Sequence, residues 1–445
     1  MKIRKLLAFV LALIMLASLV GCGAKEEAAA PEDAQDVVKE EAPKEETPKI
    51  EEPAGDEPIE IQFWYQNNAT YVTAFDELAA KFNETNGKGI TVVATGYDSS
   101  ALESAVTAGM MDGTAPVLFY TRSNAYFANL CGEGMLEDLS GYGLPLNDIA
   151  VTAATRADGG LYAAALGYQP ICLAYNKDIF AENNIAVPTN YAELEAAVNT
   201  LKAAGYDGIA YPGGAAGHVW LSRAVFHTTM GTAGYKALEE GIDAGTITAL
   251  PDDAVAALNS MSELGGLLCS GADTMTQDVL FTMFSTGEIP MVFIQPSNLI
   301  TSEAFADINA GILPVYSNSG NGEFYGEITC MMSMNKQSAD EEKSAALEFI
   351  KFVMAEENMT SFANITCDMT TIDVMPDHRY GSEFVDAVAA EGMTLRSLTQ
   401  VSKSEFWKSE LDNMILEIIF SGADANAKIE DFNQHLVDAE IASMS

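Results

Sequence analysis

The stretch Ile59-Glu60-Ile61-Gln62-Phe63-Trp64-Tyr65 opens the folded body of this 445-residue chain. Apolar and polar residues alternate up to Phe63, which is the period-two pattern of a strand with one buried face. Apolar residues then recur at helical spacing over 71–82, and residues 90–94 form a second apolar run. The order strand, helix, strand predicts an α/β lobe with a largely parallel sheet.

The same construction returns further along the chain, and residues 59–445 exceed what one hydrophobic core usually holds. Two extended runs, 161–166 and 171–175, flank Gly167-Tyr168-Gln169-Pro170, where glycine and proline favour a hinge. A long extended segment over 327–334 is expected to cross back. We therefore expect a first lobe of residues 59–166 plus about 327–375, and a second lobe of residues 168–325 plus about 376–445.

The first residues predict export. Lys2, Arg4 and Lys5 precede an apolar run, which predicts a signal peptide over residues 1–21. The Leu19-Val20-Gly21-Cys22 that follows resembles the lipobox of bacterial lipoproteins, which implies a lipid on Cys22. A plain secretory signal or an uncleaved anchor remains open. Residues 22–58 are acidic, proline-rich and nearly devoid of apolar side chains, so they predict a disordered tether that holds the body outside the cell membrane.

Charge and cysteine usage exclude several classes of protein. A formal net charge of −41 argues against a nucleic-acid partner and against electrostatic attachment to anionic lipid. The body has five scattered cysteines without CxxC spacing, so no disulfide framework is expected. Cys172 and Cys330 lie in apolar runs and are predicted to be buried, while the pairing state of the five cysteines stays open.

The chain carries no signature of catalysis. It has no GxSxG, HExxH, P-loop or CxxC motif, and its four histidines lack metal-ligand spacing. We therefore predict no catalytic residue, no metal and no cofactor. A glycosidase needs only two suitably placed carboxylates, which a sequence cannot show, so an anchored carbohydrate-active enzyme remains an alternative.

One segment carries a family resemblance. Leu173-Ala174-Tyr175-Asn176-Lys177-Asp178-Ile179-Phe180, followed by Pro188-Thr189 and by Tyr191-Ala192-Glu193-Leu194, resembles the YNKDxF…P-T…EL segment of extracellular solute-binding protein family 1, which contains maltose- and multiple-sugar-binding proteins. Residues 158–163, 284–291 and 345–352 resemble further blocks of that family in the same order.

The resemblance implies a two-lobed periplasmic-binding-protein-like fold of type II, with hinge crossings and a cleft between the lobes. It also implies a monomeric receptor that binds a sugar or oligosaccharide and delivers it to a separate ABC permease in the membrane. A ligand-sensing lipoprotein that presents its closed form to a membrane kinase shares this fold and remains a second alternative.

Sugar recognition requires aromatic faces and planar polar groups, and these occur here after the predicted strands. Gln66 lies among the candidates after the first strand, where alternation turns either Trp64 or Tyr65 inward. For every aromatic candidate, burial in the core is the alternative. The predicted ligand-binding residues are Trp64, Tyr65, Asn67, Tyr120, Arg122, Asn124, Tyr168, Gln169, Trp220, Gln295, Tyr325 and Glu327.

The chain departs from the family at one such position. Many sugar-binding relatives have a glycine and a stacking tryptophan after the strand at 291–294, whereas this chain has Gln295-Pro296-Ser297. We expect Gln295 to form hydrogen bonds with a polar ligand there, since the usual stacking platform is missing.

Overall fold

The computed structural model describes residues 58–444 except 157, 214–217, 319, 373, 392–394 and 398–404. The predicted signal peptide, Cys22 and the tether up to residue 57 lie outside the described residues. The chain divides into two units, 1–48 and 49–445, and all described residues belong to the second unit.

The first lobe is built on three parallel strands, as the opening stretch predicts. β1 pairs with β2 on one side and with β3 on the other. The helix after β1 begins where the Asn68 side chain accepts a hydrogen bond from the backbone N–H of Tyr71 at 2.8 Å, which satisfies one of its free amide groups. The elements of this part are β1 (Ile59–Gln66), α2 (Ala69–Thr85), β2 (Ile90–Tyr97), α3 (Ser99–Asp112), β3 (Leu118–Thr121), α4 (Ala125–Gly132), a 3₁₀ turn (Ser140–Tyr142) and α5 (Asp148–Ala154).

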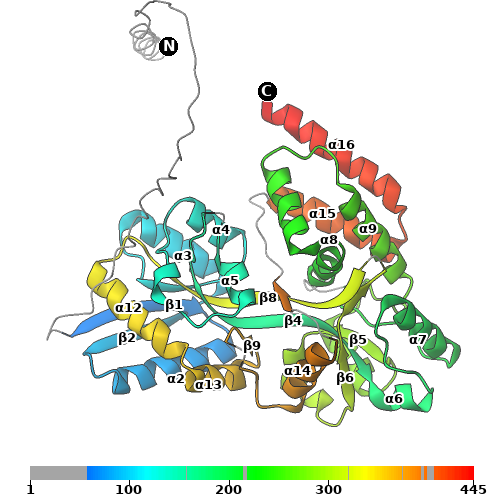
Figure 1. Ribbon diagram of the computed structural model, residues 1–445, viewed down its shortest axis with the longest axis horizontal. Helices are drawn as coiled ribbons and strands as arrows, with labels where there is room; N and C mark the ends of the chain where they lie inside the picture. Colours follow the sequence, from blue (N-terminus) through cyan, green and yellow to red (C-terminus); the bar gives the residue numbers. More distant parts are fainter. Residues whose placement is uncertain are drawn as a thin grey trace, which may run out of the picture. The chain divides into compact units, whose positions relative to one another are not determined.

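Two long antiparallel strands, β4 (Ala164–Asn176) and β8 (Gly320–Met334), run from the first lobe into the second (Figure 1). The sheet order is β2-β1-β3-β8-β4-β5, so one continuous sheet joins the two lobes. The sequence predicted two extended runs on either side of a hinge at 167–170, whereas β4 continues as one strand through these residues and pairs with β8. Glycine and proline leave only a register shift at Gly167.

The second lobe surrounds the far half of β4. There β4 pairs antiparallel with β5 and β6, while β7 pairs with the start of β8. Its elements are α6 (Lys177–Glu182), α7 (Tyr191–Ala203), α8 (His218–Asp243), α9 (Asp252–Gly265), α10 (Gln277–Ser285), β5 (Met291–Ile294), α11 (Pro296–Thr301), a 3₁₀ turn (Glu303–Phe305), β6 (Ala310–Leu313) and β7 (Val315–Ser317).

The last third of the chain returns to both lobes. α12 packs on β1 and α13 on α2, whereas α14 packs on α11 and β6, and α15 packs on α8 and α9. α12 and α13 thus contact elements described with the first lobe, and α14 and α15 contact elements described with the second, while the lobe boundaries stay predictions. The remaining elements are α12 (Asp340–Val353), α13 (Glu356–Thr366), β9 (Met369–Thr370), α14 (Arg379–Glu391), β10 (Leu395–Ser397), α15 (Glu405–Ser421) and α16 (Ala425–Met444).

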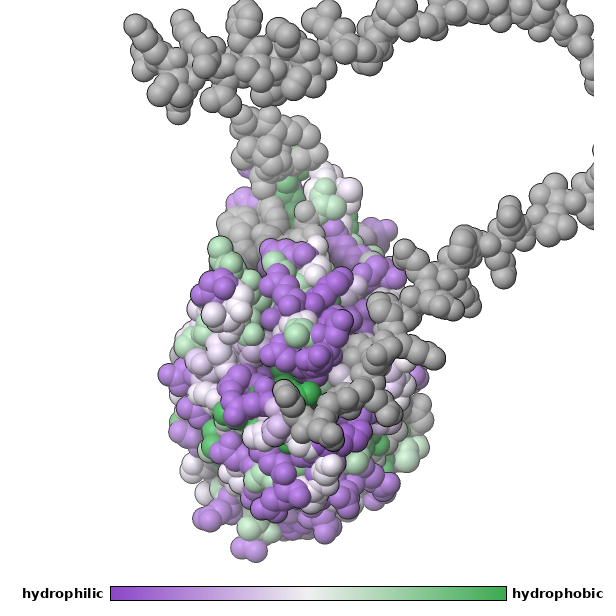
Figure 2. All heavy atoms as spheres, turned by 90° about the vertical axis from the view of Figure 1, so that its left-hand side faces the viewer, coloured by the Kyte–Doolittle hydropathy of each residue, from purple (hydrophilic) through white to green (hydrophobic). Residues whose placement is uncertain are grey.

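Apolar side chains fill the interior. Phe63 packs edge-on against Phe75 of α2 and Phe349 of α12, with ring centroids 4.9 and 6.0 Å apart. Cys172 and Cys330 are buried as predicted, and all five body cysteines are free thiols. Figure 2 shows hydrophilic residues over most of one face. In the described part of the chain, no helix combines the length and the hydropathy needed to cross a membrane.

Candidate functional site

The parallel strands of the first lobe end at one edge of the sheet, which we call the carboxyl edge. β1 ends at Gln66, β2 at Tyr97 and β3 at Thr121. Just past β3, the backbone N–H of Ser123 donates to the carbonyl oxygen of Ile328 in β8 at 3.4 Å. The carboxyl edge therefore adjoins the two crossing strands, and open α/β sheets bind ligands at such edges.

An aromatic pair lies at this edge. Trp64 is half-buried, and its ring centroid lies 4.9 Å from that of Tyr97 at the end of β2, with the rings tilted by 39°. Asn67 follows β1 with an exposed side chain, and its backbone N–H donates to the carbonyl oxygen of Tyr97 at 2.6 Å. Trp64 and Asn67, which are both predicted ligand residues, therefore lie at the carboxyl edge.

Three polar residues lie at the same carboxyl edge, Gln66 at the end of β1 and Arg122 and Ser123 just after β3. Arg122 is half-buried and forms no ion pair with any described residue. The Oε1 atom of Gln66 and the Oγ atom of Ser123 are both buried, and neither has a hydrogen-bond partner among the described residues. Ser123 is only 4% exposed. A buried polar atom without a partner is costly, so each such atom calls for an explanation.

At the crossing, two predicted ligand residues meet each other. The Nε2 group of Gln295, at the start of α11, donates to Oε1 of Gln169 in β4 at 3.1 Å. The Nε2 group of Gln169 donates in turn to Oδ1 of Asp368 at 2.6 Å. Glu327 in β8 is half-buried and pairs in register with Gln169. The crossing thus gathers polar side chains from both lobes.

Asp368 is fully enclosed, at 1% exposure. Its Oδ2 atom accepts hydrogen bonds from the hydroxyl of Tyr71 at 3.2 Å and from that of Thr329 at 3.5 Å. Burial disfavours the charged form and raises the pKa of Asp368 to about 7, although these hydrogen bonds oppose the rise. A carboxyl group that titrates near neutral pH therefore lies at the crossing.

Four predicted ligand tyrosines lie instead in the core. Tyr65 is 2% exposed and its hydroxyl donates to Oδ1 of Asp76 at 3.0 Å, so Trp64 rather than Tyr65 is the residue of the pair that faces away from the core. Tyr120 is buried, and its hydroxyl donates to the carbonyl oxygen of Thr329. Both rings are buried, which removes them from the candidate ligand contacts.

The two predicted ligand tyrosines at the crossing strands are buried as well. Tyr168 is 1% exposed and its hydroxyl donates to the carbonyl oxygen of Phe324 at 3.4 Å. Tyr325 has no exposed surface, lies edge-on to His227 with ring centroids 5.1 Å apart, and donates its hydroxyl to Glu323. Both tyrosines stabilise the packing around the crossing strands.

Two further candidates differ from the prediction or lie outside the description. Asn124 caps α4, because its Oδ1 accepts from the backbone N–H of Phe127 at 3.1 Å and its Nδ2 donates to Oε1 of Glu103 at 3.2 Å. Its amide group is therefore used locally. Trp220 lies in α8, but its side chain lies outside the described residues.

Tyr97, Ser123 and Asp368 were not among the residues predicted from the sequence. Ser123 directly follows the third strand beside Arg122, so its position could have marked it. Asp368 carries no such signal, because it lies between α13 and β9 and is 199 residues from its partner Gln169.

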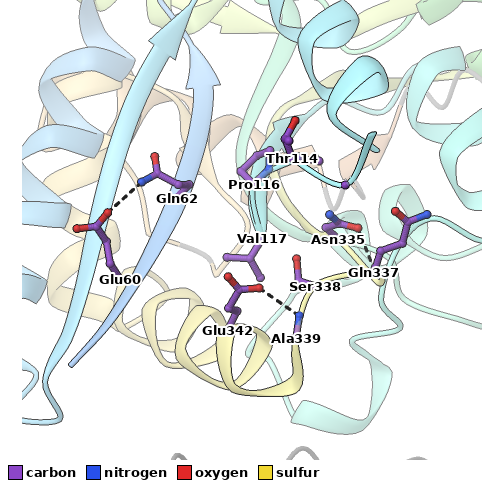
Figure 3. Close-up of a pocket in the computed structure, with 12 residues that line it drawn as sticks. Glu60, Gln62, Thr114, Pro116, Val117, Asn335, Gln337, Ser338, Ala339 and Glu342 are labelled. Carbon is purple, nitrogen blue, oxygen red and sulfur yellow. Dashed lines mark hydrogen bonds between the residues drawn. The ribbon is translucent and has the colours of Figure 1, made fainter. Parts of the chain in front are cut away.

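A hollow of about 340 Å³ lies at the opposite edge of the sheet, which we call the amino edge (Figure 3). The Nε2 group of Gln62 donates to Glu60 at 3.4 Å, and Glu342 accepts from the backbone N–H of Ala339 at 3.1 Å. None of the predicted ligand residues lines this hollow. Within the described residues, no group of three or more His, Cys, Asp or Glu side chains could hold a metal ion.

A family model described as bacterial extracellular solute-binding protein matches residues 77–391. No curated protein matches the chain.

Solved structures share the fold at low sequence identity. A family 1 extracellular solute-binding protein from Bifidobacterium longum subsp. infantis is 17% identical with a TM-score of 0.70, covering 85% of this chain and 98% of its own. A chitin oligosaccharide binding protein is 18% identical with a TM-score of 0.67, covering 86% and 99%. The solute receptor AcbH, described as preferring β-D-galactopyranose, is 14% identical with a TM-score of 0.70, covering 88% and 99%.

Proposed function

The chain belongs to the bacterial extracellular solute-binding proteins, and from this premise we propose that it binds a sugar or oligosaccharide between its lobes and delivers it to an ABC permease. The permease would be a separate chain that docks on the ligand-bound form. Ligand contacts from both lobes would favour the closed arrangement, because only a ligand that binds one state more tightly can shift the equilibrium.

The observation that carries this proposal is the pair of buried oxygen atoms at the carboxyl edge, Gln66 Oε1 and Ser123 Oγ, for which the described residues offer no hydrogen-bond partner. Ligand hydroxyls would supply the missing hydrogen bonds on binding. Each such atom costs about 1–3 kcal/mol while it remains unpaired, so its pairing strengthens binding.

The neighbouring side chains suit a saccharide. The half-buried Trp64 beside Tyr97 offers an aromatic face for the apolar side of a pyranose ring. Arg122, Gln169, Gln295 and Glu327 can bind adjacent hydroxyl groups. The two relatives with saccharide names support this ligand class.

The remaining predictions complete this proposal. Cys22 would carry the lipid anchor, the acidic tether would space a monomeric body from the membrane, and the ligand would leave unchanged because the protein is a receptor without catalytic activity. Replacement of Cys22 by alanine should abolish incorporation of labelled fatty acid and release the protein from the membrane fraction.

A thermal-shift screen tests the ligand class. The chain without residues 1–21 is heated with β-D-galactose, chitin oligosaccharides, polyols, amino sugars and peptides. A ligand at 100 times its Kd stabilises the folded form by about 2.7 kcal/mol and raises the melting temperature. We expect a shift with one saccharide class and recovery of that saccharide unchanged. No shift with any carbohydrate would contradict the proposal, and a cleaved product would favour the enzyme.

A further inference from the structure

The crossing between the lobes contains a directional chain of hydrogen bonds. It begins at Asp368, passes through the amide group of Gln169 in β4, and ends at Gln295 at the start of α11. β9 holds Asp368 beside β4, since Thr370 pairs with Gly167 and Met369 with Tyr168 (Figure 1). Register places Ile294, the residue before Gln295, opposite Cys172 of β4. This series of hydrogen bonds therefore links the first lobe to the second through the crossing strand β4.

The fold leaves room for this carboxyl group. A Cβ atom at Gly167 would lie 2.6 Å from Oδ2 of Asp368, closer than any carbon atom can approach without displacement. The absence of a side chain at Gly167 and the left-handed backbone of Cys367, with φ of 59°, bring Asp368 next to Gln169.

The chemistry of the groups fixes the direction of the chain. An ionised carboxylate only accepts hydrogen bonds, so the NH₂ group of Gln169 must face Asp368 and its carbonyl oxygen must face away. That oxygen accepts from the NH₂ group of Gln295 at 3.1 Å. The carbonyl oxygen of Gln295 therefore points away from Gln169, and no described residue donates to it.

On this geometry, and given the proposed function, we propose that Asp368 is a positioning residue that acts through Gln169 to present the Gln295 carbonyl oxygen as an acceptor for a ligand hydroxyl. Asp368 does not touch the ligand. Its removal would free both amide groups to rotate, and a rotated Gln295 would present donors instead of an acceptor.

The surroundings leave Asp368 as the group that responds to pH. Burial raises the pKa values of the ionisable groups near it, which are therefore neutral at pH 7: Tyr71 of α2, Tyr120 of β3, Cys330 of β8, Tyr168 of β4 and the adjacent Cys367. The nearby charged side chains are Arg122, which opposes the rise in the pKa of Tyr120, and Glu327, which faces Gln169 across the strand pair. The pKa of Asp368 is about 7, so its acceptor-only form predominates at pH 8.

A ligand-free experiment tests the chain of hydrogen bonds directly. The protein lacking residues 1–21 is labelled with ¹⁵N-glutamine, and the side-chain amide signals of Gln169 and Gln295 are followed from pH 5.5 to 8.5. We expect both signals to titrate together with a midpoint near 7. In Asp368→Asn this titration should vanish. Signals that do not titrate, or that titrate unchanged in the variant, would overturn the proposal.

Binding to β-D-galactose and to a chitin tetrasaccharide gives the second readout, by calorimetry at pH 8 and pH 6. For the saccharide that binds, we expect Asp368→Asn to lower the affinity about ten-fold at pH 8. Between pH 8 and pH 6 the affinity of the wild type should fall, whereas that of the variant should not change. Gly167→Ala, which displaces the same carboxyl group, should lower affinity in the same direction. If both variants bind the saccharide as tightly as the wild type does, the proposal is wrong.

Asp76→Asn is the control, because Asp76 also accepts a hydrogen bond from a tyrosine hydroxyl but takes no part in the hydrogen bonds that join Asp368, Gln169 and Gln295. Its affinity should equal that of the wild type at both pH values. If neither saccharide binds to the wild type, the proposed ligand class fails, while the amide titration still decides the role of Asp368.

Discussion

The two edges of the first-lobe sheet share their strands but treat polar groups differently. At the amino edge, Gln62 bonds to Glu60 and Glu342 bonds to the backbone of Ala339, so the hollow there is lined by groups that satisfy one another (Figure 3). At the carboxyl edge, the buried oxygen atoms of Gln66 and Ser123 have no partner among the described residues.

Carboxyl groups at the two edges differ in the same way. Glu137, near the amino edge, lies 3.3 Å from the ammonium group of Lys343. Asp368, at the crossing next to the carboxyl edge, accepts hydrogen bonds from hydroxyl and amide groups and forms no ion pair within the described part of the chain. A fold stabilises itself by pairing buried polar groups, so the edge that leaves them unpaired or uncompensated is the one suited to a ligand.

The largest expected effect concerns Asp368 and stability. Its pKa is about 7 in the folded protein and about 3.9 in an unfolded chain, so between these values the folded state keeps a proton that the unfolded state has lost. The free energy of unfolding therefore falls as the pH rises from about 4 to about 7, by an amount on the order of 4 kcal/mol. Asp368→Asn should remove this fall and be more stable than the wild type at pH 8.

Urea unfolding of wild type and variant between pH 5.5 and 8.5 measures that difference. Asp76→Asn serves as the control and should show no comparable gain. The quantity to compare is the free energy of unfolding of Asp368→Asn minus that of the wild type. If this difference is no larger at pH 8 than at pH 5.5, burial does not destabilise the ionised carboxyl group.

The next effect concerns the aromatic pair. Trp64→Ala should weaken saccharide binding by about 2 kcal/mol, close to thirty-fold, because the variant loses the face on which the sugar ring packs. Trp64→Phe should recover part of this loss. Calorimetric titration measures both, and unchanged affinity in Trp64→Ala would move the ligand away from β1.

A smaller effect with opposite signs is expected at Ser123. Ser123→Ala removes a buried hydroxyl without a partner, so the free protein should gain about 1 kcal/mol of stability. Its saccharide affinity should fall about five-fold, because the ligand loses a hydrogen bond. Melting curves and titrations of one preparation test both signs, and a loss of stability would mean that the hydroxyl is paired in the free protein.

The smallest effect is expected at the amino edge. Gln62→Ala removes a hydrogen bond between exposed side chains, so stability should change by less than about 0.5 kcal/mol and saccharide affinity should not change. If this variant binds the saccharide less tightly, the amino edge also affects ligand binding, and the proposed difference between the two edges is wrong.

The class of fold follows from the sequence patterns, while the location of the site stays a prediction. Period-two alternation from Ile59 to Phe63 and helical spacing over 71–82 predicted the first strand and helix, because these patterns record which side of an element is buried. The same logic placed Trp64 at the carboxyl end of the first strand, and Asn67 and Arg122 just after strands. The family resemblance around residues 173–180 agreed with the later match to the family model.

Only the tertiary structure decided which side chains reach that site. Tyr120, Tyr168 and Tyr325 look like sugar-binding aromatics in the sequence, yet all three are buried and contact segments far along the chain. Asp368 and Gly167 meet because β9 pairs with β4, and the continuity of β4 through Pro170 depends on β8. Burial and hydrogen-bond partners across such separations depend on long-range packing, which local sequence patterns do not encode.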